Sequence, residues 1–415
     1  MNTALYIAKK MGGEWQKGSR IVRTSSAIVA GSVALSICVI VIALSIVGGF
    51  RKEIRERVTG FAGQVIVAPF GVDYINDAFP LSTELSYLHR ILACNNVSHT
   101  QYFAFKRGLI KTDIAMQGIV IKGVGKEFDR SFFTHSLHRG TFPQWNDTLP
   151  SMELLISKRM ADALALDVSQ HVDVYFIDQS ATRVRRFTVS GIYDAALEEV
   201  DLSLVIGDIR VVQRLNNWTP MQVGGIELTL HRPEQMEATA GEVREVAARY
   251  ATGNDQALSV KTVKDIFSHL FDWLNLIDTN LLIVLLLMVA VAGVNMVSGL
   301  LIMLFDKTSM IGVLKAVGMK NRDIRLTFIY RMGRLVLWGM LIGNVVAITL
   351  CLIQQKYTLI TLDQANYAVP NVPIYLHFWN TCAINLLAFA LIILFMLLTT
   401  TLISRISPER SLRVK

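Results

Sequence analysis

Apolar and polar stretches alternate unevenly along this chain, with one long apolar run near the N-terminus and three in the last third. The four runs cover residues 27–47, 281–305, 335–353 and 382–403, and none contains Asp, Glu, Lys or Arg. About 20 helical residues, rising about 1.5 Å each, cross a hydrocarbon layer of about 30 Å. The pattern therefore predicts four membrane spans, with a large polar insert between the first and the second.

The polar insert mixes the sequence periods of strands and helices. Alternating runs predict strands at residues 64–69, 118–124, 153–156, 172–177, 187–192, 202–206 and 225–230. Helical spacing predicts helices at 82–93, 158–165, 208–215 and 233–250, and a helix at 263–280 that continues into the second span. The predicted fold class is an α-helical membrane protein with four transmembrane helices (1+3) and a large α+β periplasmic domain inserted between helices 1 and 2.

Composition and charge agree with a membrane protein and give its orientation. Hydrophobic residues make up 52% of the chain and charged residues only 18%, against about 25% in soluble domains. The net charge of +8 comes from Lys and Arg beside the spans: five in residues 1–26, seven in 306–334 and four in 404–415, but one in 354–379. By the positive-inside rule both termini and the 306–334 loop are cytoplasmic. The charge is thus an orientation signal, and no nucleic-acid partner is expected.

The spans and the charge pattern set the expected domain boundaries. The first run is too long, and its end too bulky, for a cleaved signal peptide, so we expect a retained span. The expected segments are a cytoplasmic N-terminal interfacial helix (1–26), transmembrane helix 1 (27–48), a periplasmic α+β domain with stalk helices (49–275), transmembrane helix 2 (276–305), a cytoplasmic loop (306–334), transmembrane helix 3 (335–353), a periplasmic loop (354–379), transmembrane helix 4 (380–403) and a cytoplasmic tail (404–415).

The sequence contains no recognisable catalytic set. It has no G-x-x-x-x-G-K-[ST] phosphate loop, no H-E-x-x-H and no G-x-S-x-G, and Gly123–Lys126 has the spacing of a turn. His135 and His138 lack a third metal ligand and are interpreted as ordinary surface or core histidines. Cys94 is the sole cysteine of the external domain, so no disulfide is expected there. We therefore predict a non-catalytic chain without a metal site.

The cytoplasmic loop carries the most specific motif of the chain. Apolar residues from Met310 to Val317 predict a short amphipathic helix that ends at Gly318. The segment MIGVLKAVGMKNRDI resembles the coupling helix of four-span ABC permeases of the FtsX/MacB type, in which that helix docks on an ATPase. Five further segments resemble, in order, the lipoprotein-releasing (Lol-type) branch of these permeases: LSIVGGFRKEIRERVTGFAGQVIV, IKGVGKEFDRSFFTHSLHRGTF, ISKRMADALALDVSQHVDVYF, YAVPNVPIYL and ISPERSLR.

This resemblance implies a function, partners and a location. The chain is expected to be the permease subunit of an ABC transporter in the bacterial inner membrane, with a MacB-like core domain in the periplasm. A separate LolD-like ABC ATPase subunit would bind ATP and Mg, so this chain needs no cofactor. The other implied partners are a second permease subunit, identical or different, a lipoprotein substrate, membrane lipids and a periplasmic lipoprotein carrier. The expected mechanism is mechanotransmission, in which ATP-driven motion releases the lipoprotein.

Two sets of residues are candidates for these contacts. In the coupling segment, Leu314 and Val317 are expected to fill a groove of the ATPase, with Lys315 and Asp323 at its rim; the full set is Ile311, Leu314, Lys315, Val317, Gly318 and Asp323. A lipoprotein extractor also needs an apolar cavity, because each acyl CH₂ moved into water costs about 0.8 kcal/mol. Residues at the level of the external membrane surface are expected to line its mouth: Val47, Phe50, Ile54, Leu276, Leu281 and Leu285.

Departures from the family pattern leave alternatives open. Met310 stands where the coupling helix usually opens with an acidic residue, and Gly48 where the span exit usually has Asn. The hairpin turn near residues 178–183 is short for the hook with which Lol-type permeases recruit a carrier, so a different subunit is a candidate for carrier docking. Related permeases that serve efflux or regulate periplasmic hydrolases are the first alternative, and a non-transporting membrane-anchored scaffold is the second.

Overall fold

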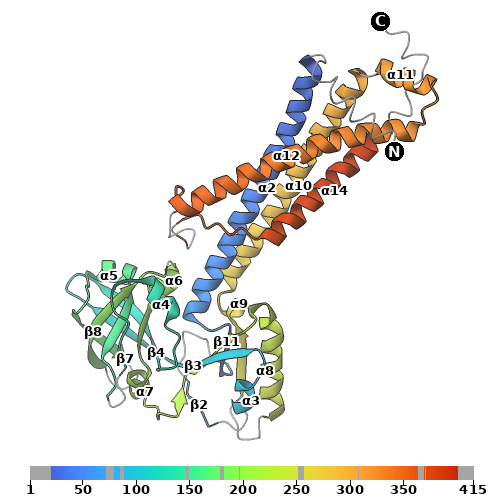
Figure 1. The fold of residues 1–415 in the computed structure, drawn as a ribbon. Helices are drawn as coiled ribbons and strands as arrows, with labels where there is room; N and C mark the ends of the chain where they lie inside the picture. The colour runs from blue at the N-terminus through green and yellow to red at the C-terminus, as the bar shows by residue number, and fades with distance from the viewer. Residues whose placement is uncertain are drawn as a thin grey trace. The chain divides into compact units, whose positions relative to one another are not determined.

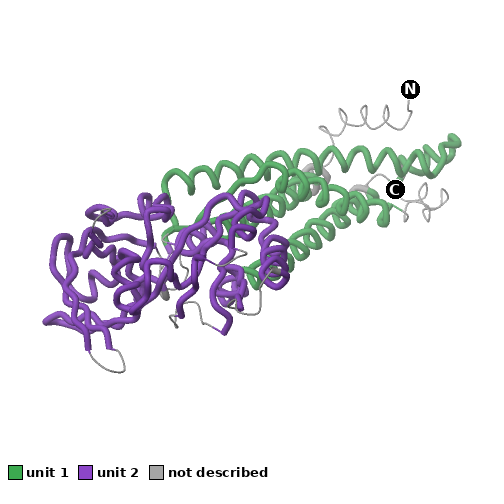
Figure 2. Tube along the Cα trace, turned by 90° about the horizontal axis from the view of Figure 1, so that it is seen from below, with its two compact units in different colours: residues 1–52, 274–361, 371–415 green, residues 53–273, 362–370 purple. Residues whose placement is uncertain are grey.

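The computed structural model describes residues 20–400 except 72–78, 85–87, 146–148, 178–181, 196, 251–256, 307, 363–368 and 370. The chain forms two compact units, shown in green and purple in Figure 2. Unit 1 comprises Met1–Lys52, Leu274–Thr361 and Asn371–Lys415, and unit 2 comprises Glu53–Trp273 and Leu362–Pro370. Most of the expected N-terminal helix (1–26) and the whole expected tail (404–415) lie outside the described residues.

Four long helices carry the apolar runs (Figure 1). They are α2 (Arg20–Phe61), α10 (Ser268–Asp306), α12 (Asn321–Tyr357) and α14 (Phe378–Thr400). All four are long and apolar enough to cross a membrane, and the α+β domain separates the first from the second, which confirms the predicted fold class. With 37 residues, α12 extends for about 55 Å and is longer than a single bilayer crossing requires.

Unit 1 is held together by close helix contacts at small residues. A Cβ added at Gly339 would lie 2.7 Å from the Ala30 carbonyl oxygen, and one added at Gly343 would lie 2.4 Å from that of Ala34. These contacts confirm that the G-x-x-x-G segment permits close packing, here of α12 against α2. The buried core around them includes Val33, Ile37, Met296, Phe328, Met332, Val336, Ile392 and Met396.

A reciprocal amide pair joins α12 to α14 inside the apolar region. Asn344 donates from Nδ2 to Asn385 Oδ1 at 2.8 Å, and Asn385 donates back to Asn344 Oδ1 at 3.0 Å. Asn344 therefore serves the packing of these two helices. Interhelical amide hydrogen bonds of this kind contribute about 1 kcal/mol in membranes.

Gly343→Ala is expected to force α2 away from α12 and to lower the thermal unfolding midpoint of the full chain in detergent, because overpacking costs about 1–3 kcal/mol. The matched control is Gly333→Ala on the same helix, where the nearest atom to a new Cβ is Ile393 Cδ1 at 4.0 Å. Circular dichroism melting compares the two variants. Equal midpoints would show that the α2–α12 contact does not constrain the fold.

Unit 2 is built on a ten-stranded mixed sheet. Its strand order is β12-β1-β11-β3-β4-β9-β6-β8-β5, and β7 pairs with both β3 and β8. The strands are β1 (Val65–Pro69), β3 (Val97–Lys111), β4 (Met116–Val124), β5 (Leu137–Gly140), β6 (Glu153–Ser157), β7 (His171–Ile177), β8 (Thr182–Tyr193), β9 (Leu204–Asp208), β11 (Gly225–Leu230) and β12 (Leu258–Thr262). A separate pair joins β2 (Leu81–Ser82) to β10 (Gln222–Val223).

Short helices accompany the sheet. They are α3 (Leu88–Leu92), α4 (Ser131–Ser136), α5 (Lys158–Leu164), α6 (Glu198–Asp201), α7 (Ile209–Leu215), η2 (Pro233–Gln235), α8 (Met236–Tyr250) and α9 (Val263–Ile266). Ser157 and Asp208 cap α5 and α7 by accepting from Met160 and Arg210 N–H groups. The main core lies on β3, β4, β6–β9 and these two helices. β6 and β9 are buried at nearly every position, which accounts for their unbroken apolar sequences.

Two predicted helices differ from those in the structure. The helix expected at 82–93 reduces to α3, because Ser82 belongs to β2 and pairs with Gln222. The helix expected at 263–280 is interrupted at Phe267, where backbone angles of φ −103° and ψ 40° separate α9 from α10. A capping box between Thr262 and Asp265 fixes the start of α9.

Two of the passages between the units lie inside helices, and they lead to neighbouring strands of unit 2. The unit boundary falls after Lys52 within α2 and before Leu274 within α10. After α2 the chain continues into β1, and before α9 it leaves through β12; these two strands pair antiparallel, with Val65 opposite Thr262. The two helical connections of unit 2 are therefore linked by one strand pair, whereas Leu362–Pro370 joins unit 2 separately.

Candidate functional site

The predicted coupling segment forms a short helix with a sharp end. Helix α11 spans Thr308–Ala316, and Gly318 follows it with a φ of +92°. The N–H of Gly318 donates to the Lys315 carbonyl at 3.0 Å, and that of Met319 donates to the Leu314 carbonyl at 3.0 Å. A left-handed residue after the last turn is a common helix stop that glycine adopts without strain, so the prediction that Gly318 ends this helix is confirmed.

The apolar residues of the segment divide between an inner and an outer side. Ile311 is fully buried in the core of unit 1, and Leu314 packs half-buried against the same core. Val317 is 82% exposed, and Val313, four residues before it, is 50% exposed. The outer side therefore presents a small apolar surface made by Val313 and Val317. Sequence reasoning omitted Val313, although its spacing of four from Val317 places both on one helix face.

The two charged candidates lie at neighbouring helix ends. Lys315 lies half-buried in the last turn of α11, and Asp323 lies half-buried in the first turn of α12. Each sign suits its helix end, since cations stabilise C-terminal turns and anions N-terminal turns. Docking of an ATPase on this segment stays a prediction.

The six candidates for the cavity mouth differ in exposure. In unit 1, Leu276 is 63% exposed, and Val47, Leu281 and Leu285 are half-buried. Phe50 is 8% exposed, whereas Ile54 is completely buried within unit 2. In this conformation the Ile54 side chain has no open surface, and the lining role of the set stays a prediction.

The double glycine at the end of the first span has a structural reason. A Cβ at Gly49 would lie 2.3 Å from the Pro373 carbonyl oxygen, so no larger residue fits without displacing that segment. Next to it, the Tyr375 N–H donates to the Ser45 carbonyl at 2.9 Å, and the Lys52 Nζ lies 4.7 Å from the Tyr375 ring centroid. A segment before α14 thus lies directly against α2.

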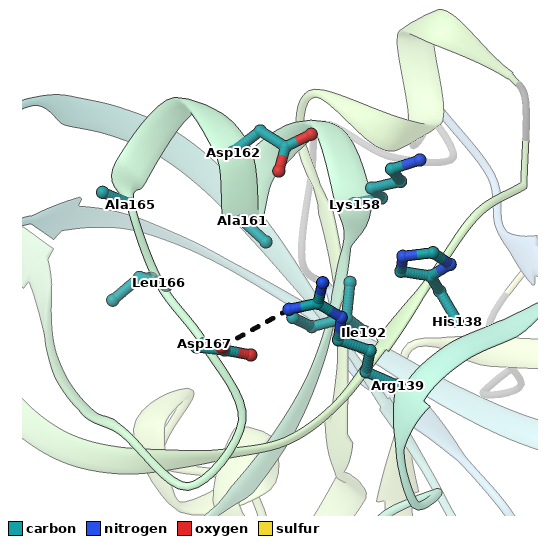
Figure 3. Close-up of a pocket in the computed structure, with 9 residues that line it drawn as sticks. All are labelled: His138, Arg139, Lys158, Ala161, Asp162, Ala165, Leu166, Asp167 and Ile192. Atoms are coloured by element: carbon teal, nitrogen blue, oxygen red, sulfur yellow. Dashed lines mark hydrogen bonds and ion pairs between the residues drawn. The ribbon is translucent and has the colours of Figure 1, made fainter.

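Unit 2 contains a pocket that sequence reasoning did not identify (Figure 3). Its volume is about 390 Å³, and Figure 3 shows the basic side chains of β5 and the start of α5 around it. It is lined by His138, Arg139, Lys158, Ala161, Asp162, Ala165, Leu166, Asp167 and Ile192. Arg139 and Asp167 form an ion pair at 3.5 Å, and both are largely exposed. Among the described residues no cluster of His, Cys, Asp and Glu could hold a metal ion.

A buried carboxyl group lies beside this region. Asp201, at the end of α6, is 2% exposed; its Oδ2 accepts from the Leu197 N–H at 3.1 Å, while Oδ1 has no hydrogen-bond partner among the residues that the structure describes. Burial, reinforced by the nearby charge of Asp194, raises the pKa of Asp201 to about 7. Backbone N–H groups and Arg159 oppose this increase without cancelling it.

The predicted hairpin of unit 2 is present. β7 and β8 pair from His171 opposite Thr188 to Ile177 opposite Thr182, and residues 178–181 of the turn lie outside the described part of the chain. Arg186 holds Asp173 across the strands with two hydrogen bonds of 2.8 and 2.9 Å. This bidentate pair supports the register of the two strands on their exposed face.

The fold and the coupling segment together define a class of membrane permeases. Residues 26–246 match the family model of the MacB-like periplasmic core domain, and residues 282–408 match that of the FtsX-like permease C-terminal region. The chain belongs to the family of ABC permeases that combine these two parts, which confirms the family predicted from the motifs.

Individual relatives agree over most of the chain. It is 24% identical over 400 residues to the lipoprotein-releasing system transmembrane protein LolC of Xylella fastidiosa (strain 9a5c), covering 92% of each chain. It is 23% identical over 363 residues to LolE of Haemophilus influenzae, covering 85% of this chain and 83% of LolE. The periplasmic region of MacB from Actinobacillus actinomycetemcomitans is 12% identical, with a TM-score of 0.36 over 53% of this chain and 98% of that one.

Proposed function

We propose that this chain is the permease subunit of an ABC transporter that releases lipoproteins from the inner membrane. The observation that carries the proposal is the alignment with LolC over 92% of both chains, which includes the spans, the inserted domain and the coupling segment. ABC permease family membership and the four spans indicate an inner-membrane, multi-pass, non-catalytic subunit. A separate LolD-like ATPase would supply ATP and Mg²⁺, and a second permease subunit would complete the pair.

In the proposed mechanism α11 receives the motion of the ATPase. The outer face of Val313 and Val317 would dock on the ATPase, with Lys315 and Asp323 near the contact. Because Ile311 and Leu314 pack into the core that α12 shares with α2 and α10, movement of α11 would shift these spans. Both termini would be cytoplasmic and unit 2 periplasmic, so this movement would reach unit 2 through α2 and α10. The lipoprotein would leave through an apolar cavity near Val47, Phe50, Leu276, Leu281 and Leu285.

The function is tested by reconstitution. The chain, its partner permease and the ATPase encoded beside it are placed in proteoliposomes with a triacylated lipoprotein, and ATP-dependent release is measured with and without a periplasmic carrier. Release is expected only with ATP. ATPase binding without any release would favour a permease for other cargo, and failure to bind an ATPase at all would favour a membrane-anchored scaffold.

Val317→Asp is expected to weaken ATPase binding at least tenfold, which corresponds to about 1.4 kcal/mol, while leaving the fold intact. Val317 is 82% exposed, so an aspartate there disturbs no internal packing but places a charge in an apolar contact. Co-purification of the ATPase with the full chain measures the effect. Val184→Asp, an exposed valine of unit 2, is the matched control. Undiminished ATPase recovery with Val317→Asp would refute this docking face.

A further inference from the structure

A lysine is buried in the middle of the sheet of unit 2. Lys122 lies on β4 between Phe105 of β3 and Ile206 of β9, and its side chain is 1% exposed. Its Nζ donates to Glu227 Oε1 of β11 at 2.6 Å and also to the main-chain carbonyl of Phe61. The side chain thus connects the sheet to a residue outside it.

The charge is fully accommodated by neighbouring groups. Glu227 is completely buried, and its second oxygen accepts from Gln101 Nε2 at 2.6 Å. The Gln101 side-chain oxygen Oε1 in turn accepts from the Asp129 N–H at 3.1 Å. The Phe103 and Phe128 ring centroids lie 5.8 and 5.6 Å from the ammonium group.

Stability alone does not explain this arrangement. Desolvation of two buried charges offsets most of their attraction, and apolar residues of similar volume often replace such pairs without loss. Burial accordingly lowers the pKa of Lys122, although Glu227 opposes the decrease. An apolar replacement would lose the hydrogen bond to Phe61, which holds the main-chain carbonyl of that residue in place.

Phe61 is the last residue of α2. Its carbonyl is among the final four of the helix, which lack intrahelical donors and carry the negative end of the helix dipole. A cation that donates a hydrogen bond to this carbonyl holds the end of the helix in two ways. Its charge is attracted to the negative end of the dipole, and the hydrogen bond has a preferred direction.

The side chains around Phe61 reinforce this anchor. The Phe61 ring lies 5.2 and 5.3 Å from those of Phe132 and Phe133 and 5.8 Å from that of Tyr193, measured between centroids. A Cβ at Gly60 would lie 2.3 Å from the Phe132 ring, so the helix approaches this cluster as closely as its backbone allows. The last turn of α2 is therefore held by a hydrogen bond from β4 and by an aromatic cluster on α4 and β8.

We propose that Lys122 is the positioning residue through which movement of α2 is transmitted to the sheet of unit 2. The inference rests on the proposed function, because it assigns a structural path to the mechanical step. Nucleotide-driven motion of α2 would displace Phe61, and the Lys122–Glu227 pair would carry that displacement to β4 and β11. Without the pair, the end of the helix would lose its hydrogen-bonded connection to β4 and β11.

The test is Lys122→Met/Glu227→Gln, which removes both charges and the bond to Phe61 but keeps an amide for Gln101. The variant is reconstituted with its partner permease and ATPase. Its ATPase rate is expected to stay within twofold of wild type, and lipoprotein released per ATP is expected to fall at least fivefold. The matched control is Arg186→Met/Asp173→Asn, which removes an ion pair of the same domain that does not touch α2.

Hydrogen exchange supplies a readout independent of the cargo. Nucleotide-induced changes in the amide exchange rates of residues 53–61 are expected to extend to β4 in the wild type. In the variant these changes are expected to stop at residue 61. If β4 responds equally in both, or release per ATP is unchanged, the inference is overturned. If the wild type releases no lipoprotein but its nucleotide-induced exchange changes still extend to β4, only the proposed function fails. Should this variant not fold, Lys122→Met/Glu227→Leu/Gln101→Leu offers an all-apolar replacement with the same expected outcomes.

Discussion

Lys122→Met alone is expected to lower the free energy of unfolding of the α+β domain by about 3–5 kcal/mol. The substitution leaves Glu227 completely buried with a negative charge and no cation, and an uncompensated buried charge carries a large desolvation penalty. The loss is measured from the slowest-exchanging amides of β3 and β4 in the full chain in detergent.

The neutral pair separates the cost of an unpaired charge from the worth of the ion pair. Lys122→Met/Glu227→Gln is expected to remain within about 1 kcal/mol of wild type, because it leaves no buried charge behind. Equal destabilisation by the single and the double substitution would mean that Lys122 contributes mainly by packing.

Asp201→Asn is expected to remove a pH dependence that weakens the wild-type domain as the pH rises from about 4 to about 7. The folded pKa of about 7 exceeds the ordinary value of 3.8, so the folded state binds more protons than the unfolded state between these values. The contribution of Asp201 to stability is therefore fully present below pH 3.8 and is lost as the pH rises through about 7. Between pH 5 and pH 8 the loss amounts to about 2–3 kcal/mol.

The asparagine variant keeps the contacts of the aspartate without its charge. Its side-chain oxygen can still accept from the Leu197 N–H, so the domain is expected to be as stable at pH 8 as at pH 5. Chemical unfolding of the full chain in detergent at both pH values compares the two proteins. A wild-type domain whose stability rises between pH 5 and pH 8 relative to the variant would contradict the raised pKa of Asp201.

Local signals in the sequence predicted much of this protein. The four spans follow from runs without charged residues, and the end of α11 follows from a glycine that adopts a φ of +92°. Strands β4, β6, β7 and β11 lie within two residues of their expected positions, because alternation and β-branching are properties of the segment itself.

The misses depended on distant partners. Ser82 looked helical but pairs with Gln222, and the break at Phe267 follows no Pro or Gly. Lys122 gave no signal, because a lysine within an apolar strand is recognised as an anchor only once Glu227 and Phe61 are placed beside it.

The pairing of β1 with β12 has a consequence for how such proteins diversify. Since the polypeptide goes into and comes out of the domain at adjacent positions, everything between residues 64 and 262 forms a cassette closed by its own first and last strands. A homologous cassette could be grafted onto these helices without altering their spacing. Related permeases could thus differ in this domain while keeping the same four long helices.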